Sequence, residues 1–175
     1  TINGSGIGTF TSSLTSLSPG TTYYVRAYAT NGVGTSYGAT RTFTTSAATI
    51  PTGIITIGAS SITQNTASSG GTITSDGGAP ITIKGICWSS TSTSPTISNS
   101  NTNNGSGINS FTSSLTGLTA NTTYYVRAYA INSVGIAYGN TIVFTTLPNL
   151  AVGQSYQGGI IAYIFVPGDS GYIAG

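Results

Sequence analysis

The stretch TTYYVRAYA at residues 122–130 decides the fold, and the same letters occur at residues 21–29. Apolar and polar side chains alternate along it, and a period of two is typical of a β-strand with one face against a core. The face that we expect to lie on the core carries Tyr124, Val126, Ala128 and Ala130. The opposite face carries Tyr125, Arg127 and Tyr129 and is expected to point outward.

This strand belongs to a longer repeat. Residues 1–45 align without a gap to residues 102–146, a shift of 101 residues, with identity at roughly two thirds of the positions. A repeat of this length is a whole domain. The sequence therefore predicts four parts, with both ends falling inside domains. They are the C-terminal half of a first domain (1–46), a complete domain (47–146), a linker (147–150) and the start of a different, truncated β-rich domain (151–175).

Six segments of the complete copy have the length and alternation of short strands, and nothing in it has a helical pattern. The strand candidates are Gly53–Ile57, Ala67–Thr74, Ile81–Ser89, Ser110–Leu115, Tyr124–Ile131 and Thr141–Thr145. Pairs that tolerate positive φ, such as Asn104-Gly105 and Asp76-Gly77, lie between strand candidates. Short strands separated by regular turns predict an all-β sandwich.

The chain carries almost no charge. Four Lys or Arg, two Asp or Glu and no His make 3% charged residues, against about 25% in an ordinary globular domain. Four scattered cations cannot neutralise a run of phosphates, so the composition excludes nucleic acid as a partner. No apolar stretch reaches the roughly 18 residues of a membrane span. Weak electrostatic repulsion instead favours the packing of copies side by side.

Candidate catalytic and metal-binding residues are few. Residues 34–38 match G-x-S-x-G with Ser36 at the centre, but the second copy has Ala137 there and the chain has no His to act as a base. We expect a turn at this point. Asp76 is expected to form a turn as well, and Asp169 would suit calcium only with further ligands. The sequence predicts no enzyme, no cofactor and no metal.

The segment Leu17-x-Pro19-x-Thr21-x-Tyr23 resembles the signature of fibronectin type III domains. The second copy keeps Leu118, Thr122 and Tyr124 and has Ala120 where this family has Pro. The N-x-x-G that follows each strand and the closing FTT are similar to the same family. The resemblance implies tandem immunoglobulin-like β-sandwiches, in which Tyr23 and Tyr124 form tyrosine corners close to Leu17 and Leu118.

A narrower resemblance concerns residues 66–90, TASSGGTITSDGGAPITIKGICWSS, followed by the tyrosine motif. This order is similar to repeats in very large secreted surface proteins of Gram-negative bacteria, which implies an extracellular, multi-domain protein with an adhesive or structural role. Residues 152–175 resemble the opening of a domain akin to the collagen-like adhesin C-terminal domain, a suspected glycan binder. Neither resemblance implies a reaction.

The outward-facing aromatic and cationic side chains allow two interpretations. They are Tyr24, Arg26 and Tyr28 in the first copy and Tyr125, Arg127 and Tyr129 in the second. Aromatic rings can stack on sugars, which makes this stripe a candidate glycan contact. The structural alternative, which we favour, is that the guanidinium stacks on its neighbours and the rings cover adjacent strands. For Trp88 and Cys87 we expect core packing.

Two functions fit these observations. The first is a non-catalytic extracellular stalk, adhesin or filament subunit of a bacterial surface protein; the alternative is a spacer or accessory region of a large secreted carbohydrate-active hydrolase. The expected partners are neighbouring copies or domains of the same protein, in a homopolymer or through a donated strand such as Gly159–Val166. With so few titratable groups, stability should hardly change between about pH 5 and 8.

Overall fold

The computed structural model describes residues 3–149 and the backbone of two short strands, β13 (Ser155–Tyr156) and β14 (Gly159–Ile160). Within these residues every regular element is a strand. No helix there has the length and apolar character needed to cross a membrane. Most of the segment predicted to open a further domain (151–175) lies outside the described residues, as does most of the suggested donor strand Gly159–Val166.

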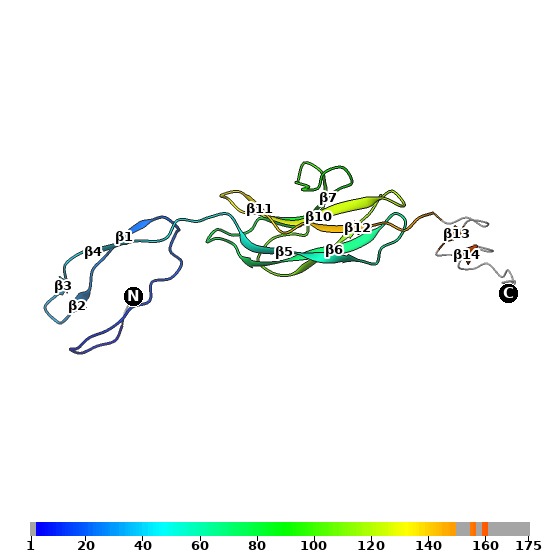
Figure 1. Ribbon diagram of the computed structural model, residues 1–175. Coiled ribbons are helices and arrows are strands. Elements are labelled where there is room, and N and C mark those ends of the chain that lie inside the picture. The colour runs from blue at the N-terminus through cyan, green and yellow to red at the C-terminus, as the bar shows by residue number, and fades with distance from the viewer. Residues whose placement is uncertain (1–2, 150–154, 157–158, 161–175) are drawn as a thin grey trace.

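Residues 52–145 form two facing antiparallel sheets (Figure 1). One sheet has the order β5–β6–β9, with β5 at Thr52–Ser60, β6 at Ala67–Ser75 and β9 at Phe111–Leu115. The other has the order β11–β10–β7–β8, and β12 also pairs with β10. Its strands are β7 (Ile83–Ser89), β8 (Ser100–Asn101), β10 (Thr123–Ile131), β11 (Ile136–Tyr138) and β12 (Ile142–Thr145).

The hydrophobic core lies between these sheets, and β10 is its central strand. Val126 and Ala128 of β10 are completely buried, and Tyr124 and Ala130 of the same face are buried as well. The opposing residues come from both sheets and from the loops between them. They include Ile54, Ala67, Ile73, Ile81, Ile86, Leu115, Leu118 and Phe144. The alternation in the sequence thus selects the core-facing side of β10 correctly.

All six predicted segments contain a strand, with ends shifted by zero to three residues. Two strands were not predicted, β8 and β11. The stretch around Ser36 is not the expected turn, because Thr35–Tyr37 form strand β3, which pairs with β2 (Tyr28–Thr30). The second copy does the same, with Ala137 of β11 opposite Ala130 of β10. Short strands whose apolar residues are half exposed give little periodicity to recognise.

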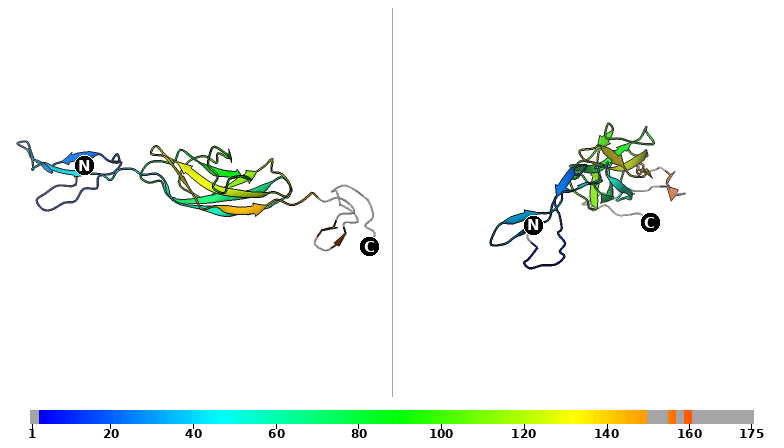
Figure 2. Two further views of the ribbon diagram at one scale, coloured as in Figure 1. Left: turned by 45° about the horizontal axis from the view of Figure 1, so that its top comes forward. Right: turned by 90° about the vertical axis from the view of Figure 1, so that its left-hand side faces the viewer.

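The first copy has the same local strand pairing as the second, but among the described residues no opposite sheet packs on it. Strand β1 (Thr22–Val25) pairs with β4 (Arg41–Thr44), with Tyr23 opposite Phe43. In the second copy Tyr124 is opposite Phe144 in the same register. Figures 1 and 2 show these strands as open hairpins beyond one end of the sandwich. Hairpin pairing is therefore encoded locally, whereas core burial is not.

The same nine residues form one strand in the second copy and two in the first. Strand β10 is continuous because β7 pairs with it along its length, from Tyr125 opposite Ser89 to Ile131 opposite Ile83. In the first copy no strand of the described residues lies in that place, and β1 and β2 are separated at residues 26–27. A strand that is bonded along only part of each edge loses the ladder that keeps it extended. Strand continuity here is a tertiary effect.

Candidate functional site

Each copy contains a tyrosine corner, as the resemblance implied. The hydroxyl oxygen of Tyr124 accepts a hydrogen bond from the backbone N–H of Thr119 at 2.9 Å. In the first copy the hydroxyl of Tyr23 accepts one from the N–H of Ser18 at 2.8 Å. Leu118 is buried in the core cluster with Tyr124, whereas Leu17 is only half-buried. The corner forms even where the sandwich is open, because its partners are five residues apart.

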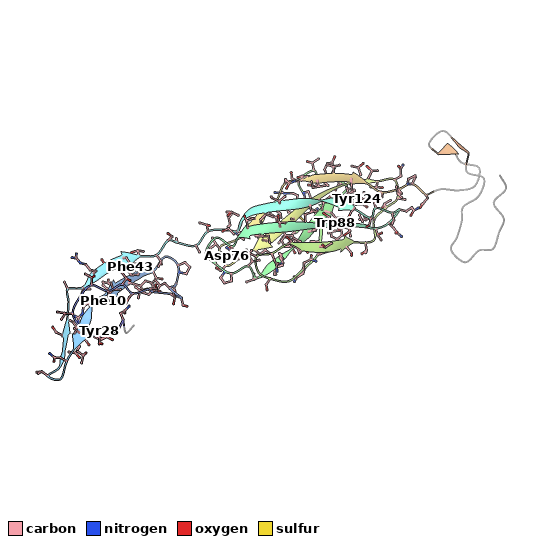
Figure 3. All side chains as sticks on the ribbon, turned by 90° about the horizontal axis from the view of Figure 1, so that it is seen from below. Phe10, Tyr28, Phe43, Asp76, Trp88 and Tyr124 are labelled. Atoms are coloured by element: carbon pink, nitrogen blue, oxygen red, sulfur yellow. The ribbon has the colours of Figure 1, made fainter. Side chains whose placement is uncertain are left out.

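Trp88 and Cys87 lie on opposite faces of β7. Trp88 is half-buried and packs against the core cluster near Tyr124, towards the end of the sandwich opposite Asp76 (Figure 3). Cys87 is completely buried, but its Sγ contacts the carbonyl of Pro95 at 3.4 Å on the outer face of the sheet. The segment after β7 folds back over that face. The predicted burial of Cys87 is right, but its surroundings are not the space between the sheets.

Tyr129 is not the surface residue that we predicted. It points to the outer face, yet it is only 2% exposed. Its hydroxyl donates to the carbonyl oxygen of Thr102 at 2.6 Å, and burial raises its pKa. The alternation in β10 predicted the direction of this side chain correctly. It could not show that the chain between β7 and β9, far away in sequence, covers the same face.

Arg127 stacks on a ring that the sequence analysis did not select. Its guanidinium carbon lies 4.6 Å from the centre of the Tyr138 ring, and its Nε donates to the carbonyl of Gly139 at 3.0 Å. Tyr125 beside it is half-buried. The repeat contains a sequence signal for this contact, because the first copy also has a tyrosine, Tyr37, at the matching position. In the structure the guanidinium carbon of Arg26 lies 4.4 Å from the centre of the Tyr37 ring.

The matching stripe of the first copy is open. Tyr24 is 73% exposed and Tyr28 is 43% exposed, whereas Tyr129, the counterpart of Tyr28, is buried. Arg26 is exposed as well. The difference arises because the segment around Thr102 that covers Tyr129 has no described counterpart beside β2. In the complete copy, the side chains that are left for a candidate glycan contact are therefore Tyr125, Arg127 and the edge of Tyr138.

The junction between the copies is anchored on both sides. On the first copy, the carbonyl of Ser46 accepts a hydrogen bond from the N–H of Gly20 at 2.9 Å. On the sandwich, the N–H of Thr49 donates to the carbonyl of Gly77 at 2.8 Å. The Nδ2 of Asn132 donates to the carbonyl of Thr49 at 2.7 Å. Only residues 47 and 48 lie between these anchors.

The turn that receives this junction requires glycine. Gly77 has a φ of +73°, and a Cβ there would lie 2.4 Å from the carbonyl oxygen of Thr49. A side chain would thus be strained and would push the linker away. Asp76 beside it acts as the expected turn former, because its Oδ1 accepts from the N–H of Gly78 at 2.9 Å. The sequence marked this turn, but its contact with the linker was not predicted.

A second contact joins the strands at which the chain enters and leaves the sandwich. Thr56 of β5 is buried, and its N–H donates to Oδ1 of Asn140, just before β12, at 3.0 Å. The Oγ1 of Thr56 accepts a hydrogen bond from the N–H of Ala128 at 2.9 Å. Because β5 and β10 belong to different sheets, this threonine links the two layers.

Within the described residues, the side chains considered for catalysis or metal binding do not lie close together. Across residues 3–149 no three side chains of the metal-binding types gather at one place. Burial raises the pKa of the Cys87 thiol to about 11, although the charge of Arg127 opposes this. The thiol is therefore protonated near neutral pH and is a poor nucleophile. Asp169 lies outside the described residues.

Comparisons with known proteins concern the fold. No family model matches the chain, and no curated protein matches it. A solved structure of titin domains A168–A170 is 21% identical with a TM-score of 0.46, covering 72% of this chain and 40% of that one. Domains d3–d4 of the rat CD45 extracellular region are 17% identical with a TM-score of 0.46, covering 83% and 75%. A fibronectin type III domain from human KIAA0970 protein is 16% identical with a TM-score of 0.39, covering 70% and 85%.

The strand order of residues 52–145 describes a two-layer sandwich by itself. Three antiparallel strands face a second antiparallel sheet, and the tyrosine corner precedes the central strand of that sheet. Every regular element of the described residues is a strand, and residues 52–145 fold as an immunoglobulin-like β-sandwich.

Proposed function

We propose that the chain is a non-catalytic structural and adhesive repeat region of an extracellular bacterial surface protein. In this role each sandwich is a stiff spacer that holds other modules at a distance. The bacterial and extracellular parts of the proposal rest on the sequence resemblance described above. The same spacer role would serve a large secreted hydrolase, so the mechanical behaviour of the repeat is common to both hypotheses.

The anchored junction is the single observation that carries the proposal. A flexible linker needs several residues without fixed partners, but here hydrogen bonds hold Ser46 on one side and Thr49 on the other. The outgoing end is anchored in the same manner, because the N–H of Leu147 donates to the carbonyl of Thr63 at 2.9 Å. Short anchored connections limit bending between neighbouring units.

The contact at Thr56 supports a role under load. Tension along the chain would pull on β5 at one end of the sandwich and on β12 at the other. These strands lie in different sheets, and Asn140 joins β12 to β5 through Thr56. Unfolding by force then requires the hydrogen bond between Thr56 and Asn140 to break together with the backbone hydrogen bonds of both sheets, instead of one strand detaching after another.

Other copies of the same protein are the partners that we propose. With 3% charged residues the chain has little electrostatic repulsion to oppose lateral contact. A homopolymer, a donated strand from Gly159–Val166 and glycan contact at Tyr125 and Arg127 stay predictions. Sedimentation of the chain at high concentration addresses the first two, since a chain that stays monomeric would count against both.

Pulling single molecules of the full chain tests the spacer role. We expect the sandwich to unfold in one step that releases roughly 300 Å of contour length. Asn140→Ala, which introduces the residue that the first copy has at position 39, should lower the unfolding force, because the buried N–H of Thr56 loses its acceptor.

Asn109→Ala is the matched control for that experiment, because Asn109 is exposed in a turn away from this contact. It should leave the unfolding force unchanged. Unfolding at very low force, or the same force for Asn140→Ala and the unmodified chain, would contradict the proposed load-bearing role.

A further inference from the structure

A polar pocket lies at the end of the sandwich away from Asp76, beside Trp88 and Tyr124 (Figure 3). Its volume is about 230 Å³. Its walls come from the end of β7, from β8 and the loop before it, from the turn after β9 and from β10. Both sheets therefore contribute to this Trp88 pocket. Its lining side chains include Trp88, Ser90, Asn99, Ser100 and Thr116.

Five polar groups on these side chains have no hydrogen-bonding partner among the described residues. They are the indole N–H of Trp88, the Nδ2 of Asn99 and the hydroxyls of Ser90, Ser100 and Thr116. Within residues 3–149 no buried side-chain nitrogen or oxygen lacks a partner, so these five groups are accessible to solvent. A molecule in the pocket can therefore bond to them without breaking a side-chain hydrogen bond of the protein.

The fold holds the frame of the pocket in place. Trp88 packs on the core cluster and lies opposite Val126 of β10 and Ser100 of β8. The Oδ1 of Asn99 accepts a hydrogen bond from the N–H of Thr96 at 3.0 Å, which fixes the amide and leaves its Nδ2 as the open donor. Binding would have little side-chain motion left to restrict, which lowers its entropic cost.

The lining selects an uncharged ligand with several hydroxyl groups. No charged side chain of the described residues lines the pocket, so an anion would lose hydration without gaining a cation, and a metal ion would find no carboxylate. An apolar ligand would leave the five polar groups without water or any other partner. The volume is below the roughly 300–1,000 Å³ of sites for drug-sized molecules, which limits the ligand to one small unit.

We propose that the Trp88 pocket binds one neutral sugar ring at the end of a glycan. The indole N–H of Trp88 and the Nδ2 of Asn99 donate to sugar oxygens. The hydroxyls of Ser90, Ser100 and Thr116 each donate to a sugar hydroxyl or accept from one. A sugar ring is the common biological unit that carries several hydroxyls and no charge, as this lining requires.

The pocket is separate from the aromatic stripe considered above for glycan contact. Trp88 lies opposite the core residue Val126, on the inner face of its sheet, whereas Arg127 lies on the outer face. The proposal supplies a ligand class for the adhesive part of the proposed function and rests on it in that respect. Pulling experiments test the spacer part separately, because loss of sugar binding would leave the unfolding force unchanged.

Trp88 is the only tryptophan of the chain, so its fluorescence reports directly on the pocket. The test is titration of the full chain with the methyl glycosides of glucose, galactose, mannose and N-acetylglucosamine. We expect at least one of them to change the emission with saturation in the millimolar range. No saturable change up to about 100 mM with any of the four would overturn the proposal. Tighter binding of the methyl glycoside of glucuronic acid would contradict an uncharged ligand.

Thr116→Val removes a lining hydroxyl and keeps the size of the side chain. Combined with Ser100→Ala, it should weaken sugar binding by about 10-fold or more. The thermal midpoint should stay the same, since neither hydroxyl has a partner among the described residues. Thr112→Val is the matched control, because Thr112 is exposed on β9 and does not line the pocket. Unchanged affinity in the double variant, or an equal loss in Thr112→Val, would overturn the proposal.

Discussion

The side-chain amide of Asn132 donates one hydrogen bond to the carbonyl of Thr49 at 2.7 Å and another to the carbonyl of Asp76 at 2.8 Å. Its Oδ1 accepts from the N–H groups of Val134 and Gly135. One buried side chain thus holds the turn after β10, the turn after β6 and the incoming linker. The mechanical proposal depends on contacts of this kind at the ends of the sandwich.

Asn132→Asp should destabilise the sandwich by about 1–3 kcal/mol, because it keeps the turn acceptor but removes the two donors and places a carboxylate against two carbonyls. Asn31→Asp is the control, since Asn31 makes the same turn contacts at an exposed site. It should change the unfolding free energy by less than about 0.5 kcal/mol. Urea unfolding measures both. Equal effects of the two changes would show that the linker contacts add nothing.

Tyr124→Phe removes only the hydroxyl of the tyrosine corner. The N–H of Thr119 then loses its acceptor, and we expect a loss of about 1 kcal/mol. Tyr23→Phe makes the same change in the half-repeat, where the sandwich is not closed, and should leave the main thermal transition where it is. A Tyr124→Phe chain with unchanged stability would contradict the structural role assigned to the corner.

Gly85→Ala tests the close packing between β7 and the segment that covers it. A Cβ at this glycine would lie 1.9 Å from the carbonyl oxygen of Thr102 and 3.0 Å from the Tyr129 ring. The backbone would have to move, so we expect a loss of about 3 kcal/mol or more, or no folded sandwich. Gly58→Ala is the control, because no atom lies within 4 Å of the added Cβ. Equal stability of the two variants would refute this packing.

The dependence of stability on pH should be flat in acid and fall in alkali. Burial raises the pKa of Cys87 from 9.0 to about 11 and also raises that of Tyr129. The folded state keeps these protons to a higher pH than the unfolded chain, so ionisation favours unfolding. This stabilisation is fully present below about pH 9 and disappears as the pH rises towards 11.

Thermal unfolding between pH 5 and 11 checks this expectation, with Cys87→Ala as the comparison. The variant should lose stability less steeply above pH 9, because the contribution of Cys87 is removed and that of Tyr129 is kept. A midpoint that moves by more than about 5 °C between pH 5 and 8 would reveal a coupled group that the sequence analysis missed.

The central strand and its core face were predictable because period-two alternation is a local property. Val126 and Ala128 lie in the core, as the pattern indicated. The tyrosine corner was predictable for the same reason, since Tyr124 and its partner Thr119 are close in sequence. Such features need no knowledge of the rest of the chain.

The contacts made across the fold were not predictable. Tyr129 is buried by residues around Thr102, and Thr56 is bonded to Asn140, which is 84 residues away. No local pattern encodes which loop covers the outer face of a sheet. The repeat did contain one usable signal, since Tyr37 and Tyr138 occupy matching positions and both stack with an arginine.

Amide hydrogen exchange along the two copies of TTYYVRAYA tests the central claim most directly. That claim is that the repeated block becomes a core strand only when the opposite half of the sandwich is present. We predict slow exchange at residues 123–131 and exchange close to that of an unstructured chain at residues 22–30 in the same molecules. Equal protection of the two segments, or fast exchange in both, would contradict it.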